Sequence, residues 1–119
     1  MQALFIVLND LSYLEQILSK FLDLKVRGAT IIDSQGMASA IMNSEGLNML
    51  LTGPFQRTLD NDQKGSKTIF SVIPEPDKVE EVVAEVRKIV EKSKKQVIGF
   101  MFTVPVSGIY PMKPKFIEK

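Results

Sequence analysis

The stretch that decides the fold is Val79-Glu80-Glu81-Val82-Val83-Ala84-Glu85-Val86-Arg87-Lys88-Ile89-Val90. Its apolar residues recur every three or four positions, which is the spacing of an amphipathic helix, although valine also favours strands. Acidic residues gather at and before its start and lysines follow its end, and both biases suit the helix dipole. The sequence therefore predicts a helix over residues 79–90.

Strand-like segments lie on both sides of this helix. Residues 68–73 form a short apolar run rich in β-branched side chains, and Pro74 ends it. Residues 97–106 form a second such run, which is followed by a proline-containing tail over residues 107–119. The C-terminal half therefore reads as a β-α-β unit.

The N-terminal third has the same order. An apolar run over residues 3–8 predicts a buried strand, and apolar residues at helical spacing follow over residues 11–22. Asn9 or Asp10 is placed to cap this helix, and Ser12 with Glu15 forms an alternative capping box. Gly28 then interrupts the pattern, and residues 29–34 predict a second strand.

Together these elements predict one domain over residues 1–119 with the order β-α-β-β-α-β. This is the order of the α+β ferredoxin-like split βαβ fold, an antiparallel four-stranded sheet with both helices on one face. A long loop over residues 36–67 joins strands two and three, and a short helix around residues 38–51 fits its apolar content.

The central strands are more apolar than this fold requires. A sheet that is covered by helices on one face should alternate apolar and polar residues, but residues 3–8 are apolar throughout and residues 97–102 do not alternate either. Both faces therefore need cover. Further copies of the chain are the favoured cover, since closed homo-oligomers are common, and the apolar loop folding back is the alternative.

The composition excludes several classes of function. The chain has no histidine and no cysteine, which removes thiol and imidazole catalysis and nearly all zinc sites. Fifteen basic and fourteen acidic residues give a net charge of +1, whereas a protein that holds nucleic-acid phosphates usually has a larger basic excess. No apolar run is long enough to span a bilayer, and the first residues do not resemble a signal peptide, so a cytoplasmic protein is expected.

The second strand carries a more specific pattern, Val26-Arg27-Gly28-Ala29-Thr30-Ile31-Ile32-Asp33-Ser34-Gln35-Gly36. It resembles the second strand of the PII-like signalling superfamily, which opens with a glycine, has a threonine two places on, and ends in a glycine where a long loop begins. Gly28, Thr30 and Gly36 match this pattern, and Asp33 stands where the family usually has glutamate. The resemblance covers the whole chain in element order and implies a homotrimer.

The resemblance also implies a ligand cleft between subunits. On this sequence the cleft would be lined by Gly36 and Met37 of one chain and by Lys94, Lys95 and Gln96 of a neighbour. The chain departs from the family at both places, because residues 37–41 lack the polar effector-binding side chains and residues 92–97 lack glycine. The lysines also fit a solvated helix end that the dipole favours, which is the simpler interpretation.

Other chemistry has little support in the sequence. No pair of carboxylates can be placed together and no phosphate-binding glycine motif is present, so no catalytic residue, metal ligand or cofactor is expected. Residues 60–65 resemble half a calcium loop, but Lys64 stands where an oxygen ligand is required, which favours a polar turn. An RNA-recognition motif shares the element order, although residues 65–72 carry one aromatic where two or three are expected.

The function expected from the sequence is therefore that of a non-enzymatic, PII-like regulatory protein. It would bind a small anionic or nucleotide-like effector at subunit clefts and change the state of residues 37–66, which would present a surface to a partner protein. Two alternatives stay open. One is an RNA-recognition-motif-like nucleic-acid-binding module, and the other is a trimeric structural protein without a ligand.

Overall fold

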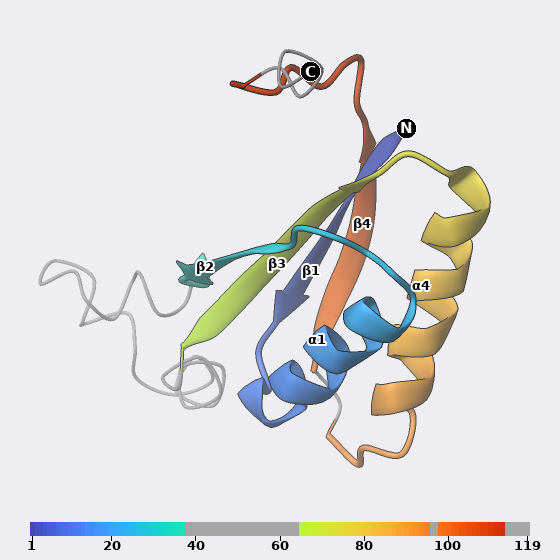
Figure 1. The fold of residues 1–119 in the computed structure, drawn as a ribbon. Coiled ribbons are helices and arrows are strands. Elements are labelled where there is room, and N and C mark those ends of the chain that lie inside the picture. Colours follow the sequence, from blue (N-terminus) through green and yellow to red (C-terminus); the bar gives the residue numbers. More distant parts are fainter. Residues whose placement is uncertain (38–64, 96–97, 114–119) are drawn as a thin grey trace, which may run out of the picture.

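The computed structural model describes residues 1–37, 65–95 and 98–113 of the chain (Figure 1). Four strands, two α-helices and one short 3-10 helix follow one another in the predicted order within these residues. Their bounds are β1 (Gln2–Leu8), η1 (Leu11–Tyr13), α1 (Leu14–Asp23), β2 (Thr30–Ser34), β3 (Ser66–Ile73), α4 (Pro76–Val90) and β4 (Gly99–Pro105).

The four strands form one antiparallel sheet in the order β2-β3-β1-β4. Strand β1 is central and pairs along its whole length with β3 on one side and β4 on the other. Figure 1 shows α1 and α4 together on one face of this sheet. The α+β ferredoxin-like fold predicted from the sequence is therefore confirmed.

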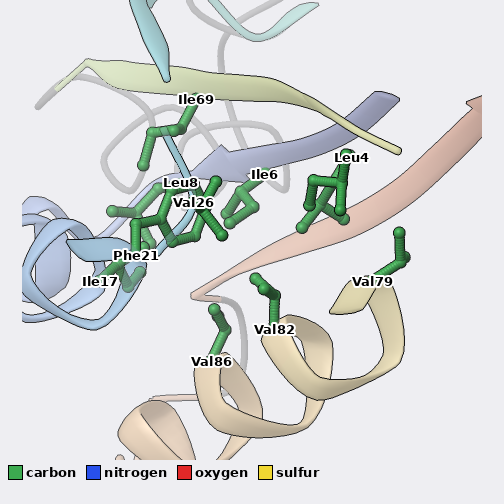
Figure 2. Close-up of a cluster of buried hydrophobic side chains, with 11 residues drawn as sticks. Leu4, Ile6, Leu8, Ile17, Phe21, Val26, Ile69, Val79, Val82 and Val86 are labelled. Carbon is green, nitrogen blue, oxygen red and sulfur yellow. The ribbon is translucent and has the colours of Figure 1, made fainter. Parts of the chain in front are cut away.

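The hydrophobic core lies between the sheet and the two helices. Alternate residues of β1 point toward the helices, and Figure 2 shows them opposite the valines at helical spacing in α4. Ile17, Phe21 and Val82 are among the least exposed side chains, so both helices contribute to one core. The buried cluster consists of Leu4, Ile6, Leu8, Ile17, Phe21, Val26, Ile69, Ile73, Val79, Val82 and Val86.

The ends of the elements differ slightly from the prediction. Helix α4 begins at Pro76, three residues before Val79, because proline fits the first turn, where its missing N–H is not needed. Strand β3 begins at Ser66, so the connection between β2 and β3 covers residues 35–65. The predicted helix around residues 38–51 lies outside the described residues.

The predicted first helix is two elements. Asp10 is its cap, as one of the sequence alternatives had it, and the chain passes through η1 before α1 begins. After β4, the backbone N–H of Val106 donates to the carbonyl of Met1, and residues 107–113 then form no helix or strand. The described part of the predicted tail is therefore irregular.

Gly99 lies where β4 comes very close to β1. A Cβ atom built on Gly99 would be 2.1 Å from the carbonyl oxygen of Val7, and this oxygen belongs to the backbone of the central strand. Any side chain at this position would push the first residue of β4 away from β1. The contact therefore restricts the position to glycine.

We expect Gly99→Ala to lower the free energy of unfolding by roughly 2–4 kcal/mol, since the backbone of a paired strand has to move. Gly65→Ala is the matched control, because Gly65 has a φ of 80° but open space around its Cβ position. The control substitution should lower the free energy of unfolding by about 1 kcal/mol, because of backbone strain alone. Urea unfolding at equal protein concentration measures both, and equal losses would contradict the close-contact argument.

Candidate functional site

The face of the sheet opposite the helices carries a row of four phenylalanines. The ring of Phe5 on β1 stacks on Phe70 of β3 at 5.4 Å and on Phe102 of β4 at 4.9 Å between centroids. Phe100 extends the row with a centroid distance of 6.0 Å to Phe102. Phe100 is 60% exposed and Phe102 43% exposed, so the outer end of the row is open to solvent.

The residues around this row are uncharged. The strand register and the alternation of side chains place thirteen residues on this face, which we call the open face: Ala3, Phe5, Val7, Thr30, Ile32, Ser34, Ser66, Thr68, Phe70, Val72, Phe100, Phe102 and Val104. The charged strand residues Asp33 and Lys67 point to the other side, where Leu8, the register partner of Lys67, belongs to the core.

The open face is a poor match for single-stranded RNA. Base stacking on a sheet needs aromatic rings, and the row supplies them, but the backbone phosphates also need nearby cations. The strand residues on this face supply none. Phe70 is also the only aromatic residue in β3, as the sequence indicated. An apolar partner surface therefore fits this face better than a nucleic acid does.

The two ends of the long connection are held together at one end of the sheet. The hydroxyl groups of Ser34 and Ser66 are 2.7 Å apart, and the Ser66 hydroxyl also donates to the Ser34 carbonyl at 3.0 Å. The ammonium of Lys67 pairs with the carboxylate of Asp33 in the next register position. These contacts fix the neck from which the connection leaves the sheet, and we call them the Ser34–Ser66 neck.

The residues predicted to bind a ligand lie at this same end of the sheet but on opposite edges. Gly36 and Met37 follow β2 at one edge, and Met37 is exposed. Lys94 and Lys95 precede β4 at the other edge, and Gln96 lies outside the described residues. Three strand spacings separate the two edges, which is roughly 14 Å. One chain therefore does not bring these two groups together.

Lys95 has a partner that the sequence did not indicate. Its ammonium lies 3.0 Å from Oδ2 of Asp10, whose Oδ1 accepts hydrogen bonds from the backbone N–H of Ser12 at 3.1 Å and from the Ser12 hydroxyl at 2.7 Å. Two further bonds join the same segments, since the N–H groups of Asn9 and Asp10 both donate to the carbonyl of Ile98. The turn after β1 and the joint before β4 are thus tied together.

A small apolar pocket of about 60 Å³ lies at Ile98, the residue just before β4. It is partly open to solvent and is lined by residues of β1, α1, α4 and the start of β4. Ligand pockets for small molecules are typically about 300–1,000 Å³. This cavity is therefore a gap in the packing, too small to hold a nucleotide or a citrate.

Hydrogen bonds and ion pairs together set the resolved pKa shifts. The hydrogen bond from the Ser12 hydroxyl and then that from Lys95 lower the pKa of Asp10 below its ordinary 3.8. Lys88 lowers the pKa of Glu85, and Glu85 in turn raises that of Lys88, on the exposed side of α4. These shifts reflect surface charge pairs, which fit binding and stability better than proton transfer.

Within the described residues, no three acidic side chains come close enough to hold a metal ion. None of the helices described here is both long and apolar enough to cross a membrane. The predicted absence of catalytic residues and of a cofactor stays a prediction.

Among the comparisons with known proteins, the likeness to solved structures bears on the fold. No protein-family model and no curated protein matches the sequence. Among solved structures, the chain is similar to PII of Arabidopsis thaliana bound to citrate, with a TM-score of 0.57 and 18% identity over 89% of this chain and 77% of that one. The described chain has a PII-like fold. At this identity the likeness concerns the fold alone, so the ligand and the assembly of this chain are proposals.

The pairing of Asp10 predicts a pH dependence of stability. Because its pKa is lower in the folded than in the unfolded chain, its contribution is complete above about pH 4 and is lost as the pH falls through the folded value. We expect Asp10→Asn, which keeps the cap, to flatten this loss of stability below about pH 4. Thermal melting of both proteins across this range measures it, and parallel curves would contradict the assignment.

Proposed function

We propose that the chain is a PII-like regulatory protein that assembles as a homotrimer through its open face and binds a small anionic or nucleotide-like effector between subunits. The open face with its row of four phenylalanines is the observation that carries this proposal. The assembly and the effector site are argued in turn.

The open face favours association with an apolar surface. Each half-exposed phenylalanine leaves roughly 100 Å² in water, so burying one is favourable by about 2 kcal/mol at ~25 cal/mol/Å². A second copy of the chain offers the same uncharged, apolar surface. In a cyclic assembly each copy covers part of the open face of its neighbour. Because the ring is closed, no open face is left in water.

Assembly would also bring together the two groups of residues that are predicted to form the ligand site. Gly36 and Met37 lie at one edge of the sheet and Lys94 and Lys95 at the other, so only neighbouring copies can place them against each other. The lysines supply positive charge for a carboxylate or a phosphate. PII of Arabidopsis thaliana was solved bound to citrate, a small polyanion, which supports an effector of this class.

The proposed readout of effector binding is residues 37–66, which leave the sheet at the Ser34–Ser66 neck. The neck is fixed by hydrogen bonds, so a ligand beside Gly36 acts at the base of this segment. A ligand that favours one state of the segment over another would present or withdraw a surface for a partner protein. In this proposal the protein is not an enzyme, and its cytoplasmic location stays a prediction.

The assembly is tested by the mass in solution. We expect light scattering at two concentrations to give a mass near three times 13.3 kDa. Phe102→Lys should reduce the mass to that of the monomer, because it places a charge within the apolar phenylalanine row of every copy.

Leu22→Lys is the control for this substitution. Leu22 is 76% exposed on α1, so replacing this apolar side chain by a charged one should leave the mass unchanged. A wild-type monomer at both concentrations would overturn the trimer and, with it, a site shared between subunits.

The effector site is tested by isothermal titration with citrate and with ATP. We expect Lys94→Ala combined with Lys95→Ala to weaken binding about tenfold or more, because two charge-assisted contacts to the anion are lost. Lys25→Ala with Arg27→Ala is the matched control, since it removes the same charge from two exposed residues between α1 and β2, at the opposite end of β2 from Gly36.

Equal affinities of the wild type and the double lysine variant would contradict the site assignment. A trimer that binds neither anion would favour the alternative of a structural trimer without a ligand. The two halves of the proposal therefore fail separately.

A further inference from the structure

We infer that Asp10 is a built-in competitor for the anionic effector, which it opposes by neutralising Lys95, and that it restricts the site to polyanions. This inference rests on the proposed effector site. It concerns the contact between the Asp10 carboxylate and the Lys95 ammonium, 3.0 Å apart, which ties the turn after β1 to the joint before β4.

The two partners are held unequally. The Asp10 side chain is only 12% exposed, and two hydrogen bonds from Ser12 fix one of its oxygens. The Lys95 side chain is 61% exposed, so its ammonium is open to an incoming ligand on the side away from Asp10. An anion that reaches Lys95 therefore meets a fixed negative charge a few ångströms away.

This arrangement sets a condition on the ligand. A ligand with one negative charge replaces the ion pair between Asp10 and Lys95 by its own ion pair with Lys95, and Asp10 repels it. Its binding is therefore weak. Lys94 is the preceding residue and is exposed, and among the ion pairs of the described residues Asp10 contacts Lys95 and not Lys94. An anion with several charges is long enough to engage Lys94 as well as Lys95. The pair therefore favours di- and tricarboxylates or polyphosphates over simple monoanions.

The contact also links the site to the fold. Asp10 caps η1, and the N–H groups of Asn9 and Asp10 donate to the carbonyl of Ile98 just before β4. Drawing Lys95 toward a ligand loosens one of the bonds between the joint and this turn. Ligand binding at the joint is thereby coupled to η1, the short helix that precedes α1.

The experiment is a double-mutant cycle with citrate and ATP as probes. Asparagine caps helices about as well as aspartate, so Asp10→Asn removes the charge and keeps the hydrogen bond from Ser12. We expect Asp10→Asn to tighten binding about fivefold, and we expect this gain to vanish when Lys95 is alanine. Asp77→Asn is the control. It removes the same charge in the first turn of α4, about 20 Å along the helix from Val90, where α4 ends before the joint.

The outcomes separate this inference from the proposed function. Wild-type binding with no gain in Asp10→Asn would overturn the competitor role and leave the effector site standing. A gain that persists with Lys95→Ala, or that Asp77→Asn reproduces, would show a general effect of charge and also overturn it. Absence of binding in every variant would overturn both the effector site and the inference, while the mass of the assembly would be unaffected.

Discussion

The structure depends on the position of β1 at the centre of the sheet, where it pairs with β3 and β4 along its whole length. Its side chains alternate between the two faces, yet both sets are apolar. Two helices can cover only one face. The other therefore exposes the phenylalanine row, and an exposed apolar surface of this kind is typical of an interaction site.

The same strand order determines where a functional site can form. Because β2 and β4 are the two edges, the segments that end β2 and begin β4 are far apart in one chain although they lie at the same end of the sheet. A contact between copies is the simplest way to unite them. Under the proposed assembly, burial of the open face and formation of the effector site would both follow from this one arrangement of strands.

The charged groups at this end have a structural role as well as a proposed functional one. Asp10 caps the first helical turn and at the same time pairs with Lys95. Ion pairs with one solvent-exposed partner, such as Lys95 here, contribute little to stability on their own. Their positions matter more, since they hold the neck and the joint, the two places where the long connection and the lysine-rich segment leave the sheet.

The sequence by itself determined the order of elements and the core, because periodicity is a local property: the valines of α4 and the apolar run of β1 indicate which elements form and which faces are buried. It also indicated that one face lacked cover. Only the tertiary structure decided which residues meet across the sheet. Asp10 with Lys95 and Ser34 with Ser66 are distant in sequence, and their contacts follow from strand order and register, which no local pattern encodes.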